Sequence, residues 1–231
     1  MKGKVVVITG AGSGLGEALA QKYSKLGSHV CLLGRTKSKL QKVASSLQGT
    51  SSIYEVDVSS LVGVQKAMQT IVSKEGKIDC LVNNAGVGIF KSLEELSEED
   101  IQKMININLT GTIFCTQAAL SYMKAENSGQ IINIVSASGK RAKATESVYS
   151  ASKFGVRGFS EAIMDELTET GIKIFGVYMG NMKTSLWDEG VDQNILEEFM
   201  EPNDVAELII ENTKKQNKLY VQDLTILNHK Q

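Results

Sequence analysis

A tyrosine and a lysine stand four positions apart in the stretch ESVYSASKFG, residues 146–155. The segment has helical spacing, so Tyr149 and Lys153 are expected on one helix face with their side chains within reach. A free phenol has a pKa of about 10, and a neighbouring cation favours its charged form and lowers that pKa. A tyrosine tuned in this way could donate a proton to a reacting oxygen. Such a pair arises easily by chance, so other features must support this interpretation.

Short apolar runs alternate with longer segments of helical spacing along the whole chain. Most of these runs are β-branched and apolar at consecutive positions, which is typical of strands covered on both faces. We therefore predict one α/β domain over residues 1–231, a doubly wound, Rossmann-like parallel sheet of about seven strands with helices on both faces. Ligands bind at the carboxyl ends of the strands in such sheets. The predicted strands are residues 4–9, 29–34, 52–58, 78–83, 130–136, 172–179 and 219–222.

The composition restricts the classes of partner. The net charge is −1 with no long run of like charge, so we expect neither nucleic acid nor an anionic membrane as a partner. The apolar run VVVIT is too short for a membrane span or a signal sequence. Cys31, Cys80 and Cys115 lie in apolar stretches, which favours reduced core thiols in a cytoplasmic protein. With two histidines and no Cys/His cluster, no metal site is predicted.

The first predicted strand runs into the glycine-rich stretch TGAGSGLGEALA. Glycines allow backbone N–H groups to approach a phosphate, and the helix that follows supplies positive potential. A Walker loop would need Gly-Lys-Ser/Thr, which is absent, and Leu15 breaks a strict G-x-G-x-x-G. The G-x-G-x-G of methyltransferases does fit, so that alternative stays open, although Thr9 and Gly34 replace the acids it usually requires. The expected phosphate-binding residues are Gly10, Gly12, Ser13, Gly14, Leu15 and Gly16.

The end of the second predicted strand indicates which dinucleotide would bind. NAD sites place an acidic residue about 20 residues beyond the glycines, whereas NADP sites use a basic one. This chain has Arg35 followed by Thr36 there. A charge-assisted hydrogen bond contributes about 1.5–3 kcal/mol, so Arg35 could favour NADPH over NADH by about 10- to 100-fold.

Together these features resemble the short-chain dehydrogenase/reductase family in its compact, single-domain, NADP-preferring form. The resemblance covers nearly the whole chain, and five motifs occur in the family's order and spacing. Ser136 precedes Tyr149 by the family's thirteen positions. The matching residues are Thr9, Gly10, Gly14 and Gly16 of the glycine motif; Asp57 and Val58; Asn83, Asn84, Ala85 and Gly86; Asn108; and Ser136, Tyr149 and Lys153.

The resemblance implies a role for each residue of the catalytic set. Tyr149 would donate a proton to the oxygen of a carbonyl that receives hydride, and Ser136 would donate a hydrogen bond to the same oxygen. Lys153 would lower the pKa of the phenol and hold the nicotinamide ribose. Asn108 would kink its helix and hold a water that passes protons to Lys153. Ser138 is a second serine that could share the role of Ser136.

The resemblance also implies cofactor contacts outside the glycine loop. Asp57 and Val58 would lie beside the adenine, and Asn84, Ala85 and Gly86 would line the cofactor. The family's P-G-x-x-x-T motif has Met179 in place of proline here, which predicts a looser loop. Gly180 and Thr184, which would approach the nicotinamide amide, are kept.

Residues 185–204 correspond to the family's substrate lid. The apolar residues of this segment, Leu186, Trp187, Ile195, Leu196, Phe199 and Met200, hint at a non-polar carbonyl substrate, although such spacing also fits plain helix packing. Basic residues at 140, 141 and 143 could attract an acidic substrate, but a solvated loop explains them better.

The sequence therefore predicts an NADPH-dependent oxidoreductase that reversibly reduces a ketone or aldehyde of small size. The resemblance implies a homodimer or homotetramer packed through the helices that carry Asn108 and Tyr149. The alternative from another class is a regulator that binds NADP on the same fold without turnover. The complete Asn108, Ser136, Tyr149 and Lys153 set argues against it, because a sensor needs no proton donor.

Overall fold

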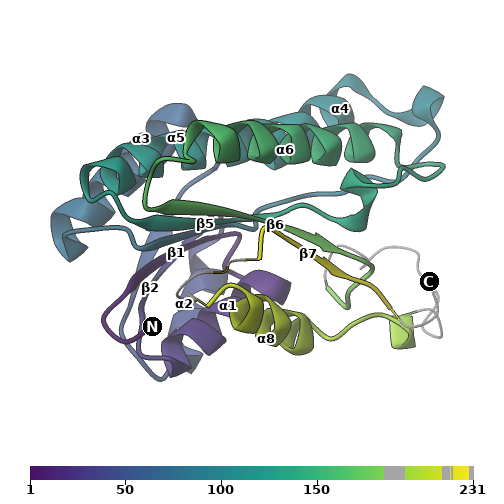
Figure 1. Ribbon diagram of the computed structural model, residues 1–231. Helices are drawn as coiled ribbons and strands as arrows, with labels where there is room; N and C mark the ends of the chain where they lie inside the picture. Colours follow the sequence, from purple (N-terminus) through teal and green to yellow (C-terminus); the bar gives the residue numbers. More distant parts are fainter. Residues whose placement is uncertain (185–195, 215–218, 220, 229–231) are drawn as a thin grey trace.

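The computed structural model describes residues 1–184, 196–214, 219 and 221–228 (Figure 1). One seven-stranded sheet forms its centre, with the strand order β3-β2-β1-β4-β5-β6-β7 and every neighbouring pair parallel. This confirms the predicted doubly wound, Rossmann-like fold. The strands are β1 (Val5–Thr9), β2 (His29–Gly34), β3 (Ser51–Glu55), β4 (Cys80–Asn83), β5 (Gly129–Ile134), β6 (Ile172–Met179) and β7 (Asp223–Ile226).

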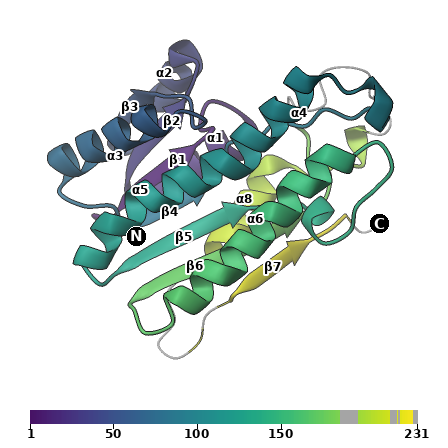
Figure 2. The same cartoon turned by 90° about the horizontal axis from the view of Figure 1, so that it is seen from above.

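Helices cover both faces of the sheet (Figures 1 and 2). The helices on one face are α1 (Gly14–Lys25), α2 (Lys37–Ser46) and α8 (Pro202–Asn212). Those on the other face are α3 (Leu61–Glu75), α4 (Glu98–Met104), α5 (Gly111–Ala125) and α6 (Ser147–Glu166). The strand β1 shows why its residues are apolar at consecutive positions. Val6 and Ile8 belong to the core beneath α1 and α8, whereas Val5 and Val7 belong to the core beneath α3 and α5.

Two helix starts follow their sequence signals. Ser97 caps α4, its hydroxyl accepting from the N–H of Asp100 at 3.1 Å while the Asp100 carboxylate accepts from the N–H of Ser97 at 3.2 Å. Pro202 occupies the first turn of α8, where its missing N–H costs nothing.

The seventh strand was predicted at residues 219–222, and this prediction is wrong. The strand lies at Asp223–Ile226, where it pairs with Gly176–Met179 of β6. It is an edge strand, and its exposure alternates instead of remaining buried at every position. An edge strand of this kind carries polar residues such as Asp223 and Thr225, so no continuous apolar run marks it.

The helix between β4 and β5 is interrupted where Asn108 lies. A π-helical segment, η2 (Ile105–Thr110), joins α4 to α5. Such segments shift the i→i−4 hydrogen bonding by one residue and occur often at functional sites. An irregularity was expected at Asn108, and the structure places one there.

The order of the strands places a topological switch point between β1 and β4. The chain leaves β1 toward β2 and β3, then returns to the other side of β1 to form β4. The loops after β1 and β4 therefore diverge at the carboxyl edge of the sheet, and a ligand can lie between them. The residues singled out from the sequence follow these and the adjoining strands.

Candidate active site

The loop after β1 is built around glycines that no larger residue could replace. A Cβ on Gly16 would run into the carbonyl oxygen of Gly10 and lie 2.7 Å from Nδ2 of Asn84. Gly10 has φ +63°, and its Cβ would stand 2.9 Å from Cα of Ala85. The side chain of Ser13, the N-cap residue of α1, makes no capping hydrogen bond. The first N–H groups of α1 therefore point to a position that suits a phosphate.

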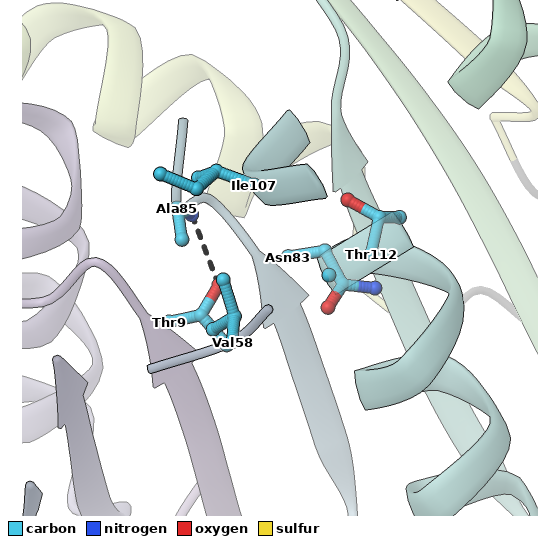
Figure 3. A pocket seen from close by; sticks show the side chains of 7 residues that line it. Thr9, Val58, Asn83, Ala85, Ile107 and Thr112 are labelled. Carbon is cyan, nitrogen blue, oxygen red and sulfur yellow. Dashed lines mark hydrogen bonds between the residues drawn. The ribbon is translucent and has the colours of Figure 1, made fainter. Parts of the chain in front are cut away.

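The loops after β1 and β4 are joined through Thr9. Its hydroxyl accepts hydrogen bonds from the N–H groups of Asn84, at 2.9 Å, and Ala85, at 3.0 Å. Figure 3 shows the bond between Thr9 and Ala85. The Asn84 side chain donates to the carbonyl oxygens of Thr9 and Gly10 at 3.0 and 3.3 Å. Asn84 thus holds the glycine loop through its amide, so its contribution to a cofactor would come from its backbone.

A small pocket lies behind this junction, lined by Thr9, Val58, Asn83, Ala85, Ile107, Gly111 and Thr112 (Figure 3). Val58 is buried, and a Cβ on Gly111 would lie only 2.7 Å from its Cγ2, so its side chain packs against the start of α5. Asn83 donates to Thr116 at 2.9 Å and to Asn133 at 2.8 Å, which ties β4 to α5 and β5. Asn83 and the side chain of Val58 therefore support the site from within the core. Leu15 also supports the site from within the core, because it is only 4% exposed and packs in the core beneath α1 and α8.

Arg35 and Thr36 follow β2 and are both exposed. Thr36 is the N-cap of α2, and its hydroxyl makes no capping hydrogen bond. Asp57, after β3, is near enough for the positive charge of Arg35 to act on it. Burial raises the pKa of Asp57, but hydrogen bonds from Ser59 and the charge of Arg35 outweigh burial, so this pKa lies below its ordinary value. Asp57 is brought near Arg35 because β2 and β3 are neighbouring parallel strands, whose carboxyl ends meet at the same edge of the sheet.

Tyr149 and Lys153 lie in the first two turns of α6 and are both buried. The ammonium of Lys153 is 5.8 Å from the centroid of the Tyr149 ring and donates to the carbonyl oxygen of Ile134 at 3.1 Å. The shared face predicted from the spacing is thus confirmed. The rings of Phe90 and Tyr149 pack edge to face, with their centroids 5.4 Å apart. Sequence reasoning missed Phe90, because nothing local marks a loop residue that packs on a distant helix.

The pKa of Tyr149 differs from the prediction. Burial raises it to about 12, the hydroxyl of Ser136 lowers it as a hydrogen-bond partner, and the carboxylate of Glu146 raises it. The expected lowering by Lys153 is absent, for a physical reason. Burial also lowers the pKa of Lys153, to about 8, so the lysine loses its charge before the phenol would ionise. At neutral pH the pair is therefore a protonated phenol beside an ammonium.

Ser136 stands just after β5 in an unusual backbone conformation. Its φ of +120° and ψ of 151° fall in a region that essentially only glycine occupies, at a cost of about 1–3 kcal/mol. Its Oγ accepts from the N–H of Ser138 at 3.2 Å, while the hydroxyl of Ser138 donates to Glu146 at 2.6 Å. The hydroxyl of Ser136 is a hydrogen-bond partner of Tyr149, whereas the hydroxyl of Ser138 is engaged by Glu146. The sequence spacing favoured Ser136 and left open only whether Ser138 shares its role.

Asn108 links the loop after β4 to α6. Its Oδ1 accepts from the N–H of Val87 at 2.8 Å, and its Nδ2 donates to the carbonyl of Val87 at 2.9 Å and to the hydroxyl of Ser152 at 3.0 Å. A Cβ on Gly86 would lie 3.4 Å from Oδ1 of Asn108 and 3.6 Å from Nζ of Lys153. Gly86, Asn108 and Lys153 therefore meet at one point.

The loop after β6 closes the site on the side of the glycine loop. A Cβ on Gly14 would lie 3.0 Å from Cγ2 of Thr184, which places Thr184 beside the start of α1. Backbone hydrogen bonds run from Gly180 to Ile226, from Met200 to Asn181 and from Lys183 to Met200. The described part of this loop is thus anchored by backbone hydrogen bonds, and the looser loop expected from the missing proline stays a prediction. Residues 185–195 of the predicted lid lie outside the described residues.

The basic residues of the loop between β5 and α6, Lys140, Arg141 and Lys143, are exposed, as the prediction of a solvated loop requires. Lys140 lies over the ring of Tyr178, 4.0 Å from its centroid, and donates to the hydroxyl of Thr225 at 2.9 Å. This lysine ties the loop after Ser136 to β6 and β7.

The remaining features concern thiols, metals and membranes. Cys31, Cys80 and Cys115 are free and buried, and burial raises the pKa of each thiol to about 12. Within the described residues, no three His, Cys, Asp or Glu side chains are placed to hold a metal ion. Among the helices in the described ranges, none has the length and apolar character of a membrane span.

The fold and the convergence of these residues at the carboxyl edge of the sheet define an α/β protein of the dinucleotide-binding class. Residues 4–194 match the sequence profile of the family described as short chain dehydrogenase, so the chain belongs to that family and is an oxidoreductase of its kind.

Similar proteins span the same length as this chain. An uncharacterised oxidoreductase of Staphylococcus epidermidis is 30% identical over 98% of this chain and 97% of its own. A sepiapterin reductase of Chlorobaculum tepidum is 32% identical over 96% of this chain and 95% of its own. The solved structure of an alcohol dehydrogenase from Thermococcus sibiricus, complexed with 5-hydroxy-NADP, has a TM-score of 0.91 at 27% identity and covers 99% of this chain and 97% of its own.

Proposed function

We propose that this protein is an NADPH-dependent reductase that converts a ketone or aldehyde of a small molecule to an alcohol, and that the reaction is reversible. One observation carries the proposal: a buried tyrosine, with its pKa raised to about 12, lies on one helix face with Lys153 and has Ser136 as its hydrogen-bond partner. A phenol with this pKa holds its proton at neutral pH. It therefore carries the proton that carbonyl reduction requires, although burial makes it a weaker acid than a free phenol, so the phenolate left after transfer needs the positive charge of Lys153.

Each residue contributes to the transfer of that proton. Bound NADPH would supply the hydride that makes the carbonyl oxygen negative. Tyr149 donates its proton to this oxygen, and the hydroxyl of Ser136 donates a hydrogen bond to it. Lys153 is positively charged below its pKa of about 8, so it stabilises the phenolate left after the transfer. Asn108 fixes the loop after β4 against α6, which keeps Lys153 and the loop in place.

The residues that would hold NADPH form a path along the carboxyl edge of the sheet. The backbone N–H groups at the start of α1, among them that of Leu15, suit the diphosphate. The side chains of Arg35 and Thr36 are exposed and suit the 2′-phosphate. The solved Thermococcus structure with a bound NADP derivative supports NADP as the cofactor. The other proposed contacts are Gly10, Gly12, Ser13, Gly14, Gly16, Asp57, Val58, Ala85, Gly86, Gly180 and Thr184.

A substrate panel tests the proposal. Purified protein is mixed with NADPH and aliphatic aldehydes, diketones, quinones and sepiapterin, and the loss of NADPH absorbance is followed with the Tyr149→Phe variant as the blank. We expect turnover of at least one carbonyl by the wild type only. Tight binding of NADPH with no turnover of any compound would instead favour the regulator that binds NADP without catalysis.

The methyltransferase alternative is tested by a thermal shift with NADPH and with S-adenosylmethionine. A ligand that binds the native state raises the melting temperature. Our proposal predicts a rise with NADPH alone, and a rise with S-adenosylmethionine alone would contradict it.

A further inference from the structure

The loop that runs from Ser136 to Glu146 is closed by a hydrogen bond that has no place in the mechanism above. The hydroxyl of Ser138 donates to a carboxylate oxygen of Glu146 at 2.6 Å. Ser138 is 6% exposed, so this hydroxyl needs a protein partner. Glu146 is half-buried, and its carbonyl accepts from the N–H of Ser150 at 2.7 Å at the start of α6. The bond thus joins the end of β5 to the helix that carries Tyr149.

Both ends of this loop are in strained conformations. Ser136 has φ +120°, and Thr145, next to Glu146, has φ +63°. A positive φ is unusual for serine and a genuine outlier for a β-branched residue such as threonine. Conformations of this kind persist only where surrounding contacts hold them, and they occur often at active sites. The bond between Ser138 and Glu146 starts two residues after Ser136 and ends at the residue that follows Thr145.

A short chain of contacts leads from Glu146 to the proton donor. Glu146 holds the side chain of Ser138, and the N–H of Ser138 donates to Oγ of Ser136 at 3.2 Å. This hydrogen bond fixes the direction of the Ser136 hydroxyl, which is the hydrogen-bond partner of Tyr149. If the loop were loosened, Ser136 and Tyr149 would both remain, but their hydroxyl groups would no longer point at the same carbonyl oxygen of the substrate.

We propose that Glu146 and Ser138 are positioning residues, whose hydrogen bond holds Ser136 in its strained conformation against Tyr149. This inference rests on the proposed function, since it assigns a purpose to the alignment of these two hydroxyl groups. Neither Glu146 nor Ser138 has to touch the substrate. Misalignment by about 1 Å at a reacting centre can lower a rate about 100-fold, so a modest loosening is measurable.

Four variants separate a positioning role from simple loop stability. Ser138→Ala removes the donor, Glu146→Ala removes the acceptor, and the double variant removes both. Glu146→Gln keeps an acceptor oxygen without the charge. Ser147→Ala is the matched control, because Ser147 is exposed and adjacent. For each we measure kcat and KM for a carbonyl found in the panel, the Kd for NADPH, and backbone hydrogen exchange over residues 136–146.

We expect kcat to fall about 10-fold in Ser138→Ala and in Glu146→Ala, as for the loss of a hydrogen bond to a charged group. The double variant should be no slower than either single variant, because all three lose the same bond. The kcat of Glu146→Gln should stay within about 3-fold of the wild-type kcat. The Kd for NADPH should change less than about 2-fold in all four variants. Single variants with unchanged kcat, multiplicative losses in the double variant, or a Gln variant as slow as the Ala variant would each overturn the inference.

Hydrogen exchange separates this inference from the proposed function. If the bond holds the loop, exchange over residues 136–146 accelerates about 10-fold in Ser138→Ala, whether or not a substrate is known. Exchange equal to that of wild type overturns the inference. If wild type turns over no carbonyl, the proposed function fails. If wild type is active and Tyr149→Phe is inactive while Ser138→Ala is fully active, only the inference fails.

Discussion

Replacing Lys153 by methionine should make the protein more stable while removing its activity. Burial lowers the pKa of Lys153 from 10.5 to about 8. Since a tenfold change in an ionisation constant is worth about 1.4 kcal/mol, holding this charge in the folded state costs about 3 kcal/mol at neutral pH. Methionine fills a similar volume without the charge. It also leaves the carbonyl of Ile134 without its partner, which costs about 1 kcal/mol.

The expected net gain is about 2 kcal/mol at pH 7, or a rise of about 4–8 °C in Tm for a chain of this size. The pH dependence has a definite sign. In wild type, the free-energy cost of burying the charge of Lys153 is constant below pH 8, where Lys153 is charged in both the folded and the unfolded state. It disappears between pH 8 and 10.5, where only the unfolded state still holds the proton, so wild type gains stability there. The advantage of the variant should therefore be absent above pH 10.5.

Urea unfolding at pH 7 and above pH 10.5 measures both effects. The control is Lys66→Met, an exposed position on α3, which should change the free energy of unfolding by less than about 0.5 kcal/mol. A Lys153→Met variant less stable than wild type at pH 7 would refute the reasoning. So would an advantage that persists at high pH, because the gain would then not come from the buried charge.

Two further predictions concern the cofactor and the pH dependence of catalysis. Arg35→Ala should weaken NADPH binding by about 10- to 100-fold and NADH binding far less, measured as Kd by fluorescence titration; equal losses would show that Arg35 does not select the cofactor. The kcat/KM for carbonyl reduction should fall as pH rises above about 8, because Lys153 then loses the charge that stabilises the phenolate. A profile that stays level to pH 10 would remove Lys153 from that role.

The fold could be predicted because its strands are buried on both faces. Consecutive apolar residues such as those of Val5–Thr9 leave little choice but a covered parallel strand. The edge strand Asp223–Ile226 was not predicted at its correct position, because only one of its residues is buried and its partner β6 is more than forty residues away in the sequence. Its register depends on a tertiary contact that no local pattern encodes.

The residues of the candidate site could be predicted from the sequence, but their burial, pKa values and hydrogen bonds could not. The spacing of Tyr149 and Lys153 correctly placed both on one helix face. The raised pKa of Tyr149 could not be foreseen, because burial comes from elements distant in sequence, including Phe90. The hydrogen bond between Ser138 and Glu146 was missed for the same reason. It depends on how the chain folds between them, and a lone glutamate gives no signal.

The most direct test of the account is the turnover of Tyr149→Phe with NADPH and the best carbonyl of the panel. Phenylalanine keeps the ring against Phe90 and removes only the proton donor. We predict a fall in kcat of about 10²–10⁴ with the Kd for NADPH within a few-fold of wild type. A phenylalanine variant that retains most of the wild-type rate would contradict the assignment of Tyr149 as the proton donor.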